Sequence, residues 1–185
     1  MRVDSLIAVY PGSFDPPTLA HVTLAEAAVR QAGITRVDLV LSLRPLGKEG
    51  RPGPTVEQRA EVLQRVASRL PWLRVEVVES RLIVDIAQGY DAVVMGADKW
   101  AQVVDPEWYG GSADARDAAL ARLPRLLVAP RAGEHPSSVA DAAGVTAAVM
   151  ALEVPPDLAD VSSTRARAGH HHLMLPEAVE SGLWT

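Results

Sequence analysis

Short apolar runs and segments with helical periodicity alternate along this chain of 185 residues. The apolar runs are continuous, which is typical of strands that are covered on both faces of a parallel sheet. The segments between them have apolar residues at helical spacing, and such alternation produces βαβ units. We therefore predict a doubly wound α/β fold, with a mostly parallel Rossmann-like sheet and helices on both faces. The expected strands span residues 5–10, 36–43, 74–79, 91–96, 125–130 and part of 146–154, and the expected helices span residues 19–33, 55–70, 81–89 and 112–123.

Length and composition predict one domain over residues 1–185, because 48% of the residues are hydrophobic and the chain is long enough for a single filled core. There is no apolar run near the roughly 18 residues that a membrane span needs, so we expect no membrane partner. The formal net charge of −5 argues against a nucleic-acid partner, which requires a basic surface. The chain has no cysteine, which fits a cytoplasmic protein.

The turn "PGSFDPPT" at residues 11–18 follows the first apolar run and precedes a helix that carries His21 in its first turn. It contains neither G-x-G-x-x-G nor the P-loop pattern, so two common nucleotide-binding solutions are disfavoured. If Thr18 is the N-cap, His21 lies beside the helix N-terminus, where unpaired N–H groups favour a phosphate. A histidine there can donate a hydrogen bond to a phosphoryl oxygen as charge develops on it. The alternative is that His21 only covers the edge of the sheet.

A second segment, "VSSTRAR" at residues 161–167, places hydroxyl groups before a short helix that carries Arg165 and Arg167. Hydroxyl and amide donors at a helix start, with a guanidinium one turn later, can hold a triphosphate. Taken alone, the same residues also fit an ordinary N-cap cluster.

Together the two segments resemble the nucleotidylyltransferase superfamily that contains the nicotinamide/nicotinate-mononucleotide and pantetheine-phosphate adenylyltransferases. That superfamily shows Gly-x-Phe-x-Pro-x-[His/Thr]-x-Gly-His after its first strand and Ile-Ser-Ser-Thr-x-Ile-Arg near its end. The resemblance implies transfer of AMP from ATP, with Mg²⁺, to the phosphate of a second substrate, with release of pyrophosphate. The residues that match the first motif are Gly12, Phe14, Pro16, Thr18 and His21, and those that match the second are Ser162, Ser163, Thr164 and Arg167.

The resemblance also implies roles for individual residues, with a C-terminal helical segment from about residue 162 closing the nucleotide site. It implies direct attack of the acceptor phosphate on the α-phosphorus, with catalytic roles for His21, Thr18 and Arg167. The alternative for Lys48 is that it is an ordinary solvent-exposed side chain with no ligand. The alternative for Trp100 and Trp108 is that they only pack in the core. The implied nucleotide-binding residues are Gly12, Ser13, Phe14, Gly96, Asp98, Ser162, Ser163 and Thr164, and the implied acceptor-binding residues are Lys48, Arg59, Trp100 and Trp108.

The acceptor is less constrained, because the features of two branches are mixed. Thr18 stands where the nicotinate branch has histidine and the pantetheine branch has threonine, and Ala20 replaces the motif glycine. "GAD" at residues 96–98 is similar to the nicotinate branch. We favour nicotinate or nicotinamide mononucleotide, hence NAD biosynthesis. The alternatives are a pantetheine-phosphate adenylyltransferase, a cytidylyltransferase and a non-catalytic nucleotide sensor. The resemblance leaves a homo-oligomer open.

Overall fold

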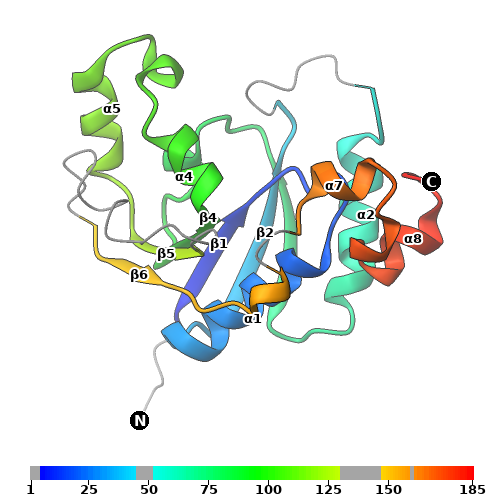
Figure 1. The fold of residues 1–185 in the computed structure, drawn as a ribbon. Helices are drawn as coiled ribbons and strands as arrows, with labels where there is room; N and C mark the ends of the chain where they lie inside the picture. Colours follow the sequence, from blue (N-terminus) through cyan, green and yellow to red (C-terminus); the bar gives the residue numbers. More distant parts are fainter. Residues whose placement is uncertain (1–4, 45–51, 130–146, 159–160) are drawn as a thin grey trace.

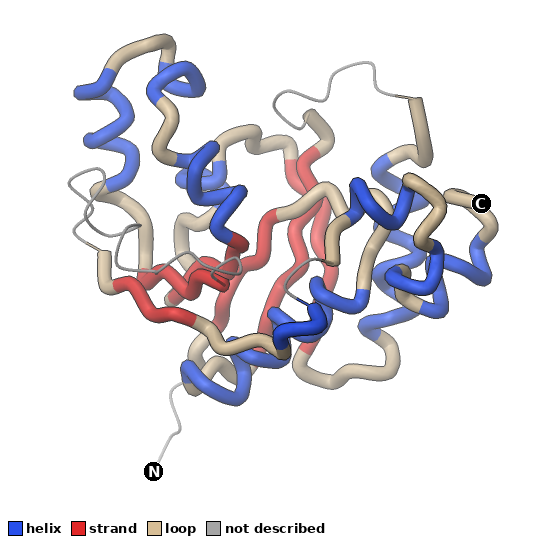
Figure 2. Tube along the Cα trace, in the orientation of Figure 1, coloured by secondary structure: helices blue, strands red, loops and turns tan. Residues whose placement is uncertain are grey.

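Six parallel strands form one sheet in the computed structural model, which describes residues 5–44, 52–129, 147–158 and 161–185. The strand order is β3-β2-β1-β4-β5-β6, with helices packed around the sheet (Figure 1, Figure 2). The predicted doubly wound α/β fold is therefore confirmed. The strands are β1 Ile7–Pro11, β2 Arg36–Ser42, β3 Leu73–Val78, β4 Ala92–Gly96, β5 Arg125–Ala129 and β6 Val149–Ala151.

The helices that the sequence predicts lie within their expected ranges, whereas those at residues 97–103 and 176–181 were not predicted. Thr18 is the N-cap of α1, and Gly33 ends that helix in the left-handed conformation, with φ of 71°. Thr55 and Gln58 form a capping box at the start of α2. The described helices are α1 Leu19–Ala32, α2 Val56–Ala67, α3 Ile83–Ile86, α4 Ala97–Val103, α5 Ala113–Leu120, α7 Ser163–Arg167 and α8 Pro176–Ser181, with 3₁₀ turns η1 Pro106–Tyr109, η2 Pro156–Leu158 and η3 His171–Leu173.

The two faces of the sheet bury different sets of side chains, because successive residues of a strand point to opposite faces. On β1, Ala8 and Tyr10 belong to the core cluster that contains the buried residues of α1 and several of those of α2. Val9 belongs to the second cluster, which it shares with residues of α3, α4 and α5. The central strand is thus covered on both sides, as its continuous apolar sequence predicts.

The topology places a crevice between β1 and β4. The chain runs from β1 outward through β2 and β3, then returns to pair β4 with β1 on the other side. In such sheets, ligands bind beyond the carboxyl ends of the strands at this change of direction. Both the turn after β1 and the start of α4 lie at that edge.

The C-terminal segment, residues 161–185, packs beside α2 (Figure 1). Val62 of α2 forms a small core cluster with Ala166, Met174 and Ala178. Arg65 donates a hydrogen bond to the Glu177 carbonyl, at 3.0 Å, so α8 is tied to α2 by polar contacts as well. Within the described ranges, no helix combines the length and the apolar character needed to cross a membrane.

Candidate active site

The β1–α1 turn, residues 12–18, is shaped by the packing of Phe14 over Gly12. Phe14 is 1% exposed and has φ of 45°, a left-handed conformation that a bulky residue rarely adopts. A Cβ atom added to Gly12 would lie 2.7 Å from Phe14 Cζ, which is too close for any side chain. The glycine and the aromatic residue of the motif therefore work as one packing unit.

His21 is oriented by the residue that caps its helix. The Thr18 backbone N–H donates to His21 Nδ1 at 2.9 Å, and Thr18 Oγ1 lies 2.8 Å from the same nitrogen. Because an amide can only donate, Nδ1 is the acceptor, and the neutral ring carries its proton on Nε2. Phe14 holds the ring edge-on, with centroids 5.0 Å apart. The arrangement fixes both the tautomer and the direction of the imidazole.

The C-terminal segment meets the β1–α1 turn through α7. Arg167 Nη1 donates to the Asp15 backbone carbonyl and lies 3.3 Å from Asp15 Oδ2. Ser163 Oγ donates to the Pro16 carbonyl at 2.8 Å. Two segments about 150 residues apart in sequence are thereby in contact, and these are the two that the sequence analysis assigns to one site.

Arg59 of α2 contacts the backbone of the turn. Its guanidinium donates to the Ser13 carbonyl and, from Nε, to the Thr55 carbonyl at 3.3 Å. Burial lowers the pKa of Arg59, and the Asp15 carboxylate opposes that shift. Arg59 is 8% exposed and holds the turn through these contacts, and its expected contact with the acceptor stays a prediction.

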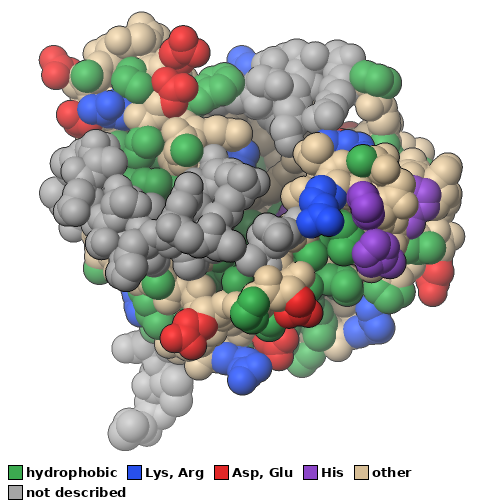
Figure 3. Space-filling model, viewed as in Figure 1, with side chains coloured by type: hydrophobic (Ala, Val, Ile, Leu, Met, Phe, Trp, Pro, Cys, Tyr) green, Lys and Arg blue, Asp and Glu red, His purple; other side chains and the backbone are tan. Residues whose placement is uncertain are grey.

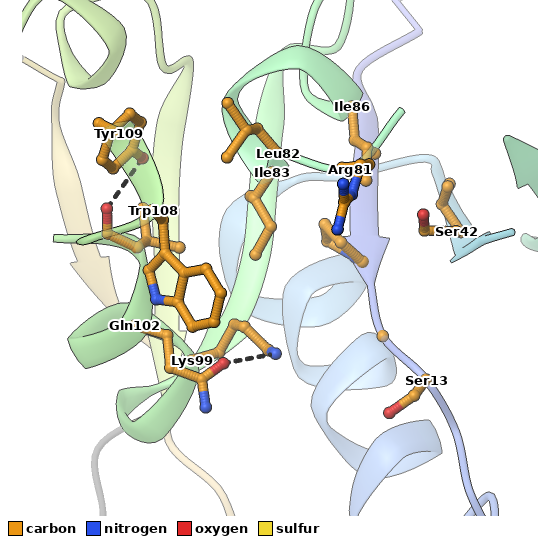
Figure 4. A pocket seen from close by; sticks show the side chains of 14 residues that line it. Ser13, Ser42, Arg81, Leu82, Ile83, Ile86, Lys99, Gln102, Trp108 and Tyr109 are labelled. Atoms are coloured by element: carbon orange, nitrogen blue, oxygen red, sulfur yellow. Dashed lines mark hydrogen bonds between the residues drawn. The ribbon is translucent and has the colours of Figure 1, made fainter. Parts of the chain in front are cut away.

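A cavity opens beside the turn at the carboxyl ends of the strands (Figure 4). Trp108 of η1 and the apolar residues of α3 form its walls, and Tyr109 is anchored by a hydrogen bond to the Val103 carbonyl at 2.9 Å. Lys99 extends from α4 toward the side on which Ser13 lies, and its Nζ donates to Gln102 Oε1 at 2.9 Å (Figure 4). The lining residues are Pro11, Gly12, Ser13, Val40, Ser42, Arg81, Leu82, Ile83, Ile86, Lys99, Gln102, Val103, Trp108 and Tyr109.

Among the residues that the structure describes, the others that the sequence predicts for the site do not line this cavity. Trp100 of α4 is 4% exposed and belongs to the second core cluster. Its Nε1 has no hydrogen-bond partner in the described part of the chain. Gly96 ends β4 and caps α4. Ser162 caps α7 by accepting from the Arg165 N–H, at 3.2 Å. Thr164 Oγ1 lies 3.4 Å from Arg167 Nη2. Lys48 and the side chain of Asp98 lie outside the described residues.

The surface over η3 carries three neighbouring histidines (Figure 3). The rings of His170 and His172 are 5.9 Å apart, and both residues are exposed. Across the described ranges, no group of three or more His, Cys, Asp or Glu side chains is placed to hold a metal ion.

Two cationic side chains of the cavity, Arg81 and Lys99, were not predicted from the sequence. Arg81 follows β3, and Lys99 lies three residues after the end of β4, so both stand just beyond the carboxyl ends of strands. That position is itself a signal, because ligands bind there in parallel sheets. Their place in one cavity becomes clear only from the fold.

The family described as cytidylyltransferase-like matches residues 9–169. A phosphopantetheine adenylyltransferase of Neisseria meningitidis serogroup C is 35% identical over 85 residues, which are 46% of this chain and 47% of that protein, so the match spans about half of the relative. A probable nicotinate-nucleotide adenylyltransferase of Anaeromyxobacter dehalogenans is 30% identical over 179 residues, covering 88% of this chain and 82% of that protein.

The fold also matches a solved structure. The Plasmodium falciparum nicotinic acid mononucleotide adenylyltransferase complexed with NaAD superimposes with a TM-score of 0.69 over 96% of this chain and 94% of that one. The two sequences are 13% identical, so this likeness concerns the fold.

Proposed function

Because the chain belongs to the cytidylyltransferase-like family, we propose that it transfers AMP from ATP to the phosphate of a mononucleotide-like acceptor and releases pyrophosphate. The observation that carries this proposal is the contact of α7 with the β1–α1 turn. Arg167 and Ser163 reach the carbonyls of Asp15 and Pro16, beside a cavity that also contains Lys99. Such a site has donors for a triphosphate on one side and room for an acceptor on the other.

In the proposed reaction, an oxygen of the acceptor phosphate attacks the α-phosphorus of ATP. The bond from that phosphorus to the oxygen bridging it to the β-phosphate breaks, and pyrophosphate leaves with the electron pair. His21 donates from Nε2 to the α-phosphate, with Thr18 fixing the ring. Arg167, Ser163 and Thr164 bind the β- and γ-phosphates. No covalent intermediate is required, so the protein contributes position and charge.

ATP enters this proposal as its magnesium complex. Mg²⁺ is commonly held by substrate phosphates together with few protein ligands. The described residues contain no metal-binding cluster of acidic or histidine side chains, and Asp15 already contacts Arg167 and Trp184. The donor set therefore fits an ion that arrives on the triphosphate and neutralises part of its charge.

The cavity favours nicotinate mononucleotide as the acceptor. Lys99 extends toward the turn and would meet the attacking phosphate, a role for which Lys48 also stays a prediction. Trp108 offers an indole face to a pyridine ring, and Arg81 offers a cation to the carboxylate of nicotinate. Pantetheine phosphate is the second candidate, since the Neisseria relative bears that name. Its aliphatic arm would use neither the indole face nor a second cation.

Replacing Trp108 with Ala should weaken acceptor binding. Stacking of a base on an aromatic side chain contributes about 1–3 kcal/mol, so the acceptor KM should rise by about tenfold or more. The KM for ATP should change little, because Trp108 lies on the acceptor side. Steady-state kinetics with each substrate varied in turn measures both values. Trp108→Phe serves as the control and should retain most of the affinity, whereas an equal rise in both KM values would contradict this assignment.

The proposed function is tested by following pyrophosphate with Mg²⁺, ATP or CTP, and a panel of acceptors. We expect release only with ATP and most rapidly with nicotinate mononucleotide. Release with CTP would instead identify a cytidylyltransferase. Tight ATP binding without turnover on nicotinate mononucleotide, nicotinamide mononucleotide or pantetheine phosphate would favour a sensor. A cytoplasmic location and a homo-oligomer stay predictions.

A further inference from the structure

We propose that Trp184 is a positioning residue for the triphosphate end of the site, acting on Arg167 through the carboxylate of Asp15. Trp184 Nε1 donates to Asp15 Oδ1 at 2.7 Å, while Arg167 Nη1 lies 3.3 Å from Asp15 Oδ2. One carboxylate therefore holds the indole with one oxygen and the guanidinium with the other. The inference rests on the proposed function and deepens it, because neither Asp15 nor Trp184 contacts substrate in that proposal.

Arg167 needs such a support. It ends α7, a helix of 5 residues, which is too short to be stable on its own and must be fixed by tertiary contacts. Its side chain is 25% exposed and would otherwise sample several rotamers. Contacts with both the carbonyl and the carboxylate of Asp15 direct the guanidinium before ATP arrives. A donor positioned in advance binds more tightly, because less freedom is lost on binding.

Trp184 is itself held by the packing of the C-terminal segment. The indole packs against the cluster that contains Val62, Ala166 and Met174, so residues of both α2 and α7 contact the indole. Arg69 pairs with Glu177 of α8, which fixes the helix that leads to this tryptophan. The indole N–H consequently has a defined direction, toward the turn. The Asp15 carboxylate thus connects the segment after α8 with Arg167 of α7.

A purely structural role would make Trp184 an anchor for α8 only. Trp184→Phe separates the two roles, because it keeps an aromatic ring in the cluster and removes the N–H. The probe is α,β-methylene-ATP, which binds without reacting, and its Kd is measured by calorimetry on the full chain. Loss of the contact between Trp184 and Asp15 frees the Arg167 guanidinium before ATP binds, so we expect the Kd of the probe to rise about tenfold. The KM for the acceptor should change little, whereas a purely structural role would lower the Tm without changing the Kd of the probe.

A double-mutant cycle tests the route of the effect. In an Arg167→Met background, Trp184→Phe should weaken the probe no further, because the group that it positions is gone. Trp72→Phe is the matched control. Trp72 is partly buried and packs against the core cluster that contains residues of α1 and α2, so its substitution should leave the Kd of the probe unchanged. Equal binding by Trp184→Phe and the unsubstituted protein would overturn the inference, as would the same loss in the Arg167→Met background.

Asp15→Asn provides a second test, because a carboxylate beside an arginine can also compete with the phosphates. Positioning by Asp15 predicts weaker binding of the probe in this variant. Tighter binding would identify Asp15 as a competitor and overturn the inference, while the proposed function would stand. Failure of the unsubstituted protein to bind the probe would reject the proposed function, and this inference with it.

Discussion

Replacing His21 with Ala is expected to lower kcat by at least about 100-fold, the scale of removing one donor that acts in the transition state. The Thr18 N–H occupies Nδ1, so Nε2 carries the proton that a phosphoryl oxygen would accept. Charge on the α-phosphate grows during the attack, and the lost donor therefore affects kcat more than the KM for ATP. Pyrophosphate release at saturating substrates measures this effect.

His171→Ala is the matched control for this substitution. His171 lies in η3 and is not among the residues that line the cavity, so we expect its substitution to leave kcat unchanged. Thermal unfolding of both variants checks that the fold is retained. If His21→Ala retains kcat within about tenfold of the parent, the transition-state role is rejected, and the ring is a packing residue between Phe14 and Thr18.

Gly12→Ala is expected to cause the second large effect, on stability and on turnover together. The new methyl group would lie 2.7 Å from Phe14 Cζ and 2.9 Å from Cε2, so the buried ring must move. Overpacking of this kind costs about 1–3 kcal/mol of unfolding free energy. The ring also touches His21, and a displacement of roughly 1 Å in a catalytic group can lower the rate about 100-fold. Thermal unfolding and kcat/KM measure the two consequences.

Phe14→Leu tests whether the clash is the cause. Leucine lacks the ring atoms that the new methyl group meets, so Gly12→Ala should be less damaging in the Phe14→Leu background than alone. The coupling free energy should exceed about 0.5 kcal/mol, the level above which neighbouring sites are non-additive. Additive effects, or a Gly12→Ala protein as stable and active as the parent, would show that the turn has room for a side chain.

The strands were predictable because the hydrophobic signal is local. "RVDLVLSL" predicts residues 36–43, and β2 is Arg36–Ser42, since both faces of this strand are buried. In contrast, α4 was not predicted. Its N-cap is Gly96, which has no side chain to cap with, and the helix follows β4 directly. The usual signals of a helix start are therefore absent from the sequence at that point.

Contacts between distant segments were predictable only in part. The motifs indicate that residues 12–18 and 161–167 lie together, and the hydrogen bonds of Ser163 and Arg167 place them in contact. The sequence does not reveal that Arg59 donates to the Ser13 carbonyl of the turn, because the register of a helix alone does not fix which residues its side chains contact. Asp15 and Trp184 are 169 residues apart, and nothing local marks them as partners.

The central claim is that the turn after β1 and the segment at α7 together direct one nucleotidyl transfer. A single-turnover experiment with ATP labelled at the α-phosphorus, Mg²⁺ and nicotinate mononucleotide tests it most directly. The account predicts that the label appears in a product joined to the acceptor and that this product is lost in both His21→Ala and Arg167→Met. Label that accumulates on the protein, or that stays in free AMP, would contradict it.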